Sequence, residues 1–357
     1  MKYNRIVLLA ILSFLSASLA YGNEESLTIH VHDASDIVSI SQFNIPQAHT
    51  YIVAATLTRS DDMQAPESTL QFMDFRTGQT QVKLHIEQAP LLSPPGPQSG
   101  MLVLPQLQPD IRWNIFEPHP DLTGLELKGD LPSFTVVTQT LQTADGYYVS
   151  GMNGENLPVI AWLDTDFNMR QERVLSGFSP GMVTGILETG GKLIALVSSE
   201  KGSAQIRLSD NLDIESEAPI DGFGANGIAL PDGGFVLTYV TFPEMNVLLE
   251  RFDANHNSAW KADLYAMSRD AVSSGVKLAT LLDGIAFAGF NENHLLVGRI
   301  GIDGKRMKQA RALGEKLDFD PNPSSHFIFT HENTIHVWGL GMSTDSFVST
   351  IYHAINN

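Results

Sequence analysis

No cysteine occurs in the 357 residues of this sequence. Disulfides, thiolate metal ligands and cysteine nucleophiles are therefore excluded, and the fold must be stabilised by the burial of apolar side chains. A chain of this length can bury a core large enough for that purpose. An exported protein without disulfides is more typical of a bacterial periplasm or exterior than of the eukaryotic secretory route.

Basic side chains are scarce, because 22 Lys and Arg residues stand against 40 Asp and Glu residues, a formal net charge of −18. Loss of Lys2 and Arg5 with an N-terminal leader would give −18 − 2 = −20. This negative field disfavours phosphate backbones and anionic membrane surfaces, so we expect no nucleic-acid partner. Cations, basic peptides, proteins and neutral saccharides remain as partners. Acidity that only keeps an exported protein soluble is the alternative.

Long apolar runs are also missing, apart from a short one at residues 6–15 that follows a basic start. Small residues come next, at the spacing of a cleavage site, so residues 1–22 are predicted to be a signal peptide cleaved after Ala20 or Gly22. The run is too short to cross a hydrocarbon core of about 30 Å. We therefore expect a periplasmic or secreted protein without a membrane span, with residues 23–357 as its single domain.

No segment shows a sustained apolar period of 3.6 residues, so few helices are expected. A module of apolar strands and polar turns recurs instead, most clearly at residues 145–168 and 232–260. The aligned second strands begin 50, 46, 45, 43, 50 and 50 residues apart, at Tyr51, Met101, Tyr147, Lys192, Phe235, Ile285 and Ile335. A period of about 40 to 50 residues built only from strands is typical of a β-propeller blade.

The repeat resembles the β-propeller superfamily, in particular loosely patterned bacterial blades in which Asp-Gly-Gly precedes two strands and an Asp- and Asn-rich turn, as at residues 232–257. The resemblance covers residues 23–357 and implies an all-β, seven-bladed β-propeller. It points to no specific family, because the Trp-Asp ending of WD40 blades and the spacing of kelch repeats are both absent. No family's catalytic residues are therefore transferred to this chain.

The seventh module ends after its third strand, close to the C-terminus, while a spare strand lies at residues 27–33. We predict that this N-terminal strand pairs beside residues 348–354, becomes the outer strand of the last blade and closes the ring. A blade can bury both of its faces only against neighbours, so a closed ring is the stable arrangement.

The loops between second and third strands should gather on one face of the disc, and each of them carries a carboxylate. These residues are predicted to form a ligand-binding rim around the channel: Asp61, Asp62, Asp110, Glu155, Glu200, Glu244, Glu292 and Asp345. Crowded carboxylates recruit cations, and Ca²⁺ is the one cofactor that the rim suggests. Solvated carboxylates too far apart to cooperate are the alternative.

Three segments place Asp or Asn at alternate positions, as at the start of a Ca²⁺ loop: residues 164–168, 253–257 and 318–322. All three lack the central glycine and the distal glutamate of that motif. Asx side chains also cap hairpin turns without an ion, which is the interpretation we favour.

Histidines supply the other candidate sites. His30 and His32 share one face of the N-terminal strand and His353 lies on its predicted partner, so the three imidazoles are candidate transition-metal ligands. Exposed residues that blunt a sheet edge are the alternative. His294 and Glu292, in one acidic loop, are the candidate catalytic acid–base pair. The sequence contains no Gly-x-Ser-x-Gly elbow, His-Glu-x-x-His motif or phosphate-binding glycine loop.

Without a stronger catalytic constellation, the sequence favours a non-catalytic binding or scaffold protein. Such a protein would hold a protein, peptide or saccharide ligand on its acidic loop face, as a monomer or as a subunit of a complex. An exported lyase or hydrolase with its active site at the channel mouth is the alternative. An accessory subunit of a periplasmic redox enzyme is a third possibility, based on analogy with other propellers.

Overall fold

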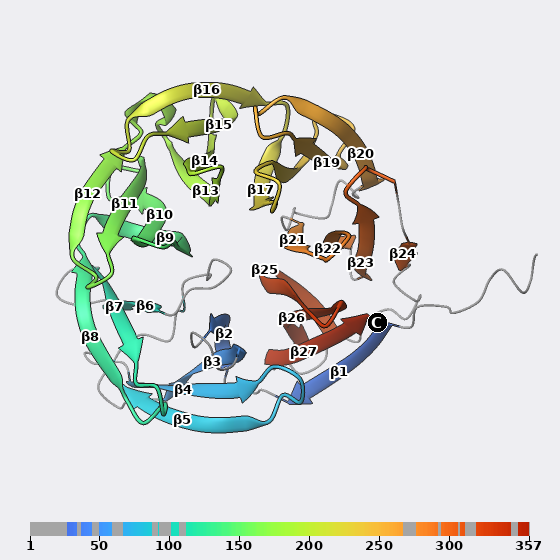
Figure 1. Ribbon diagram of the computed structural model, residues 1–357. Coiled ribbons are helices and arrows are strands. Elements are labelled where there is room, and N and C mark those ends of the chain that lie inside the picture. Colours follow the sequence, from blue (N-terminus) through green and yellow to red (C-terminus); the bar gives the residue numbers. More distant parts are fainter. Residues whose placement is uncertain are drawn as a thin grey trace, which may run out of the picture.

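The protein is an all-β ring of seven antiparallel sheets around a central channel (Figure 1). The computed structural model describes residues 27–33, 37–44, 50–58, 67–87, 92, 101–106, 112–266, 276–291, 294–305, 308–310, 319–343 and 349–356. Within these ranges the one helical element is a 3-10 turn, η1, at Ser176–Phe178. None of the described segments is a helix with the length and hydropathy needed to cross a membrane.

The first four blades follow one another along the chain. Blade one contains β2 (Ile37–Asn44), β3 (Thr50–Thr58), β4 (Glu67–Asp74) and β5 (Thr80–Ile86). Blade two contains β6 (Leu102–Gln106), β7 (Arg112–Pro118) and β8 (Leu125–Leu131). Blade three contains β9 (Phe134–Gln142), β10 (Gly146–Asn153), β11 (Pro158–Asp164) and β12 (Met169–Val174). Blade four contains β13 (Gly181–Thr189), β14 (Lys192–Ser199), β15 (Gly202–Leu208) and β16 (Ile214–Ile220).

The remaining three blades complete the ring. Blade five contains β17 (Phe223–Ala229), β18 (Phe235–Val240), β19 (Asn246–Phe252) and β20 (Ser258–Ala266). Blade six contains β21 (Lys277–Thr280), β22 (Gly284–Asn291), β23 (His294–Gly301) and β24 (Lys308–Ala310). Blade seven contains β25 (Phe319–His331), β26 (Thr334–Ser343), β27 (Ser349–Asn356) and β1 (Leu27–Asp33).

The predicted closure of the ring is confirmed. The N-terminal strand β1 pairs antiparallel with β27, from Leu27 opposite Asn356 to Asp33 opposite Thr350. Blade seven therefore has the order β1-β27-β26-β25, with β1 on the outside, beside the C-terminus (Figure 1). The two ends of the chain share one sheet, so the last blade cannot form fully without residues from both.

The predicted second strands are also confirmed. Six of the seven aligned starts lie within β3, β10, β14, β18, β22 and β26, and Met101 directly precedes β6. Several of these strands are largely buried; all six residues of β18 are buried, for example. Blade two has three strands among the described residues, and Leu92, which precedes them in the chain, is buried in the cluster between blades one and two.

The core consists of seven apolar clusters, and each one joins two neighbouring blades. The cluster between blades seven and one, for example, packs Trp338 and Ile351 against Ile40 and Ile52. Burial of apolar surface stabilises by roughly 25 cal/mol per Å², so most of the folding free energy arises between blades. No blade is a stable unit by itself.

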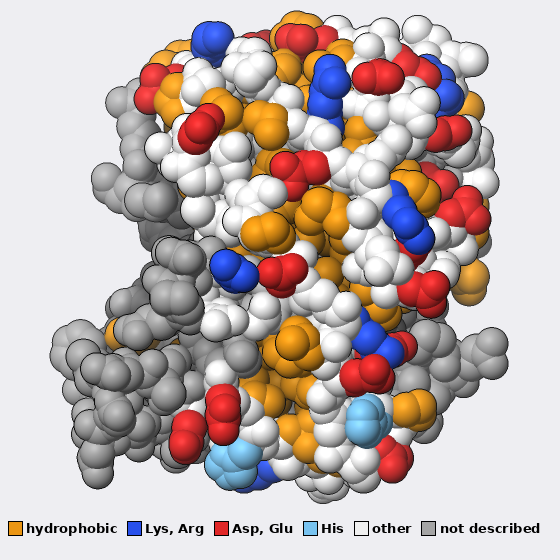
Figure 2. Space-filling model, turned by 90° about the vertical axis from the view of Figure 1, so that its left-hand side faces the viewer, with side chains coloured by type: hydrophobic (Ala, Val, Ile, Leu, Met, Phe, Trp, Pro, Cys, Tyr) orange, Lys and Arg blue, Asp and Glu red, His pale blue; other side chains and the backbone are white. Residues whose placement is uncertain are grey.

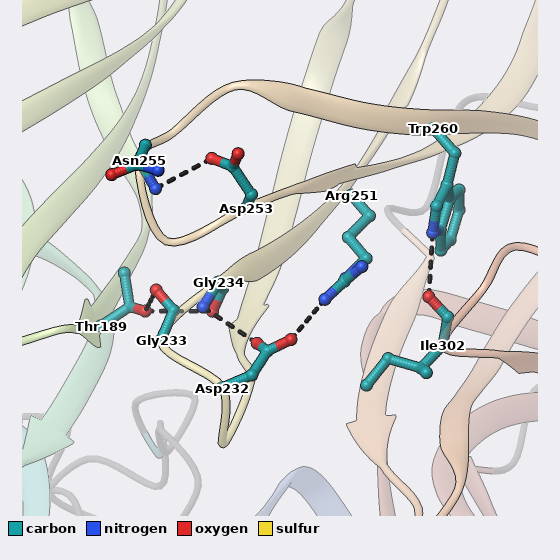
Figure 3. Close-up of polar contacts among 9 residues, drawn as sticks. All are labelled: Thr189, Asp232, Gly233, Gly234, Arg251, Asp253, Asn255, Trp260 and Ile302. Carbon is teal, nitrogen blue, oxygen red and sulfur yellow. Dashed lines mark hydrogen bonds and ion pairs between the residues drawn. The ribbon is translucent and has the colours of Figure 1, made fainter.

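Polar contacts also join the blades. Thr189, at the end of β13, donates its hydroxyl to the carbonyl oxygens of Gly233 (2.7 Å) and Gly234 (3.0 Å) in the next blade (Figure 3). Gly233 adopts a φ of +82°, which favours glycine at this tight turn. Trp260 Nε1 donates to the carbonyl oxygen of Ile302, 2.9 Å away, and joins blade five to blade six. These contacts fix the angle between adjacent sheets.

Candidate functional site

The central channel contains a cavity of about 560 Å³. Its walls are the innermost strands of six blades, β2, β9, β13, β17, β21 and β25, together with Leu92. The described lining residues combine apolar and uncharged polar side chains, and the acidic and basic ones among them, apart from His326, are Glu188 and Lys277. This composition suits a ligand that has both hydrogen-bonding groups and apolar surface.

Bulges on the inner strands shape the channel wall. The pairing register shifts at Val38 in β2, Thr138 in β9 and Thr184 in β13, so each of these residues is an extra one on its strand. The Thr138 hydroxyl donates to the carbonyl oxygen of Val183 (2.6 Å), and the Thr184 hydroxyl donates to that of Ala225 (3.0 Å). Successive inner strands are therefore tied together, which stiffens the wall that faces a ligand.

Lys277 supplies the one Lys or Arg side chain among the described channel-lining residues. It is half-buried at the start of β21, between the buried residues Val276 and Leu278. Desolvation by the surrounding protein lowers the pKa of Lys277 below its ordinary value. An ammonium group without a carboxylate partner is costly to place there, which makes Lys277 a candidate ligand-binding residue.

The predicted acidic rim is described in part. Glu155, Glu200 and Glu244 lie in the loops between second and third strands of blades three, four and five, and all three are exposed. They share one face of the disc, as expected. Five of the predicted rim residues lie outside the described residues: Asp61, Asp62, Asp110, Glu292 and Asp345.

Metal sites need clusters of ligands, and the described part of the chain has no group of three or more His, Asp and Glu residues that could hold an ion. Figure 2 shows acidic and basic side chains interspersed on the outer side of the disc. Ca²⁺ binding by the rim carboxylates remains a prediction.

Two of the three Ca²⁺-like segments are closed hairpin turns. Asp164 Oδ1 accepts hydrogen bonds from the backbone amides of Asp166 (3.0 Å) and Asn168 (2.9 Å), and Oδ2 accepts one from Arg170 Nε (2.7 Å). Asp253 Oδ1 likewise accepts from the amides of residues 255 and 257, and Figure 3 shows Asp253 beside Asn255. The Asp side chains therefore cap turns, as favoured from the sequence. The side chains of the third segment, 318–322, lie outside the described residues.

Two of the candidate metal histidines face each other. His30 lies directly opposite His353 in the pairing of β1 with β27, with ring centroids 6.1 Å apart. His353 is buried, stacks on Trp338 with a centroid distance of 4.1 Å and shares a 3.0 Å hydrogen bond with His336. These contacts place His353 in the core of blade seven. The side chain of His32 lies outside the described ones.

The candidate acid–base residue His294 begins β23, and its predicted partner Glu292 lies outside the described residues. It does not line the channel cavity. A second titratable group is closed inside blade five, where the buried Glu250 carboxylate accepts hydrogen bonds from Tyr239 (2.7 Å) and pairs with Lys261 Nζ (3.2 Å). Burial and the Glu250 charge raise the pKa of Tyr239. Neither Tyr239 nor Glu250 lines the cavity, so this cluster is not part of the candidate site.

Sequence reasoning concentrated on acidic loops and histidines and did not identify Lys277 or the polar liners of the channel. One signal was available. The strand before an aligned second strand is the innermost strand of its blade, so its side chains can face the channel. Lys277 is the one charged residue in the run Val276–Thr280, which precedes the second strand of blade six, and this charge was the signal. Which side chains reach the channel depends on the bulges, which have no sequence signature of their own.

No family model matches the chain, and no curated protein matches it. Among solved structures, the β-propeller domain of the Trilobed protease from Pyrococcus furiosus is similar, with a TM-score of 0.53 and 11% identity over 91% of this chain and 94% of that one. That domain is described as having an open velcro topology, whereas β1 closes the ring here.

Sqt1 from Saccharomyces cerevisiae matches with a TM-score of 0.51 and 11% identity, over 92% of this chain and 98% of that one. The acylaminoacyl peptidase of Pyrococcus horikoshii matches with a TM-score of 0.52 and 10% identity, over 87% of this chain and 49% of that one. At these identities the likeness shows the fold alone. The chain is therefore a seven-bladed β-propeller, and its function is argued from its own residues.

Proposed function

We propose that this chain is a non-catalytic binding or scaffold protein that acts in the periplasm or outside the cell. The observation that carries the proposal is the channel cavity of about 560 Å³, whose polar walls are mostly uncharged. Concave cavities with a few convergent polar groups are the usual form of small-ligand and peptide sites. Hydrogen-bonding walls of this kind suit the amides of a peptide or protein segment, or the hydroxyls of a saccharide.

The loop face supplies the second part of the proposal. Its exposed carboxylates, including Glu155, Glu200 and Glu244, add a negative field that speeds the approach of a basic protein or peptide. Sqt1 from Chaetomium thermophilum, similar in fold with a TM-score of 0.50 and 10% identity, was solved bound to the N-terminus of the ribosomal protein L10. A ring of this fold can therefore hold a peptide segment, which supports the proposed class of ligand.

The lyase or hydrolase and the redox-enzyme subunit remain the alternatives. A carboxylate, Glu188, and a histidine, His326, line the cavity and are the groups that a lyase or hydrolase would use there. General acid–base catalysis needs a carboxylate or histidine within hydrogen-bond reach of a bound substrate. His294 lies away from the cavity, and Glu250 is closed off by Tyr239 and Lys261. A catalytic channel would turn over its ligand, whereas a binding channel leaves the ligand intact.

Arrays of peptides and glycans probed with labelled residues 23–357 test this proposal. Thr280→Trp fills the channel from an exposed lining position, and Leu127→Trp adds the same side chain at an exposed position on β8. We expect Thr280→Trp to weaken binding by about 10-fold or more and Leu127→Trp to leave it unchanged. Equal binding by both variants, or chemical conversion of the captured ligand, would contradict the proposal.

Export is tested separately. Residues 1–22, fused to a reporter enzyme that is active only outside the cytoplasm, should give activity, and the same fusion with Lys2 and Arg5 replaced by Glu should not. N-terminal sequencing of the exported chain should begin after Ala20 or Gly22. A reporter that stays inactive, or a mature chain that still begins at Met1, would contradict export by this segment.

A further inference from the structure

Two unpaired hydrogen-bond donors lie side by side in the channel wall. Lys277 is on β21 and Asn226 is on β17, and these two inner strands contact each other. Both side chains line the cavity and both are half-buried. Neither makes a hydrogen bond or ion pair with another residue in the part of the chain that the structure describes.

The strand register places the two donors at the same depth in the channel. The aligned starts of the second strands, Phe235 and Ile285, serve as a common reference for depth in the two blades. Lys277 pairs with Ala288, which lies three residues after Ile285. Asn226 pairs with Thr238, which lies three residues after Phe235. An ammonium and a carboxamide N–H₂ group at one level of adjacent strands can both point at one ligand group. A carboxylate, which is planar, carries a single negative charge and has two acceptor oxygens, matches this pair of donors.

We infer that Asn226 and Lys277 together bind a carboxylate group of a peptide ligand inside the channel. This inference rests on the proposed binding function and gives its ligand a chemical class. A desolvated lysine without a partner costs stability, and a bound anion would offset this cost, which explains why a lysine lies in the wall. The net charge of −18 disfavours an anion of high charge at this site.

The wall favours a peptide over an acidic saccharide. Ile228, Leu278 and Ile328 alternate with the polar liners, as suits a chain of amides that carries apolar side chains. The two aromatic residues among the described liners, Phe327 and Phe329, pack into the cluster between blades seven and one. Part of each ring is therefore buried against the core, which reduces the surface left for stacking on sugar rings.

Lys277 also responds to the ligand in a way that can be measured without knowing the natural partner. The protein around it desolvates the ammonium and lowers its pKa, and a bound carboxylate reverses that effect. Reductive ¹³C-methylation and NMR titration should therefore show Lys277 with a pKa below the ordinary value of a lysine, and this pKa should rise when a carboxylate ligand is added. An unperturbed Lys277 resonance would overturn the inference.

The decisive probes are three synthetic peptides measured by titration calorimetry on residues 23–357. They are N-acetyl-tetraalanine with a free C-terminal carboxylate, the same peptide as a C-terminal amide, and an amidated peptide with one central glutamate. We expect at least one carboxylate peptide to bind at least 10-fold more tightly than the neutral amide. The free-acid and glutamate peptides distinguish a chain terminus from an acidic side chain as the source of the carboxylate.

Matched variants locate the site. Lys277→Met keeps the length of the side chain without its charge, and Asn226→Asp replaces the donor with a carboxylate that pairs with Lys277. Each should lower affinity for the carboxylate peptide by at least 10-fold and raise the melting temperature of the ligand-free protein, because an unpaired buried charge is removed or paired. Lys305→Met, at a side chain that is 87% exposed, should change neither.

Three results would overturn the inference: equal binding of acid and amide peptides, full binding by Lys277→Met, or no binding of either carboxylate peptide by the wild-type protein. These results are distinguishable from failure of the proposed function. A neutral peptide or saccharide captured on the arrays and lost with Thr280→Trp would leave the binding function standing without the carboxylate site.

Discussion

At the scale of single residues, His336 couples the stability of the closing blade to pH. The imidazole is 6% exposed, stacks on Phe329 with centroids 5.2 Å apart and shares a 3.0 Å hydrogen bond with His353. Burial, followed by the nearby His331 and Arg76, lowers the pKa of His336 to about 4. Protonation therefore opposes the folded state.

This arrangement predicts a loss of stability in mild acid. The unfolded imidazole has a pKa of about 6.5, so between that value and about 4 the unfolded chain is protonated while the folded one is not. The stabilisation is complete above pH 6.5 and is lost as the pH falls towards 4, by about 3 kcal/mol in total. Urea denaturation at pH 8 and pH 4.5 measures it.

A variant without the titrating group should flatten this dependence. His336→Phe keeps a ring to stack on Phe329, so its free energy of unfolding should change less between the two pH values than that of the wild-type protein. His119→Gln, at an exposed histidine, serves as the control and should retain the full dependence. Identical slopes for wild type and His336→Phe would show that His336 is not the group responsible.

Asp164 is a second residue with a prediction of its own. Its carboxylate holds two backbone amides and Arg170, and these contacts lower the pKa of Asp164 despite some desolvation. Asp164→Ala should lower the free energy of unfolding, because two turn amides and Arg170 lose their acceptor. If the side chain caps a turn, the loss is the same in EDTA and in Ca²⁺. A loss seen only with Ca²⁺ present would instead establish a metal site.

At the scale of elements, β1 has the largest role for its length, because it completes the only blade built from both ends of the chain. Deletion of residues 23–34 from the mature protein should lower the melting temperature by about 5 °C or more, since the outer edge of blade seven loses its partner strand. Deletion of residues 23–26, which leaves β1 intact, is the matched control. Equal melting temperatures for the two deletions would contradict the closure.

Most strands of the blades could be predicted from the sequence. Apolar alternation and turn residues located the second strand of each blade, as with Phe235 at the first position of β18. The spare strand at residues 27–33 was assigned correctly because the ring left one outer position empty. Local pattern suffices for these features, since each depends on burial that repeats from blade to blade.

The candidate site was less accessible to sequence reasoning. Loop carboxylates such as Glu155 and Glu244 could be placed on one face, because loop position follows from strand order. The placement of Asn226 and Lys277 at one level of the channel could not, because it depends on register and on bulges in separate blades. The interaction of His353 with His336 and Trp338 likewise arises from packing between strands and not from spacing along the chain.

At the scale of the whole molecule, the ring combines a rigid wall with a cavity that can hold a ligand. Seven inter-blade clusters and threonine bridges between inner strands hold the wall in place, and the channel cavity lies within that wall. A preformed wall loses little conformational entropy when a ligand binds, which favours affinity. A ring closed by β1 also keeps the relative positions of β17 and β21 fixed, and with them the donors of Asn226 and Lys277.

Hydrogen–deuterium exchange with and without a ligand captured on the arrays tests the central claim most directly, because it reports where the ligand binds on the intact protein. We predict that protection concentrates on the inner strands, above all β17 and β21, with little change on the outer strands β8, β12, β16 and β20. Protection confined to the outer strands, with the inner strands unchanged, would contradict the account.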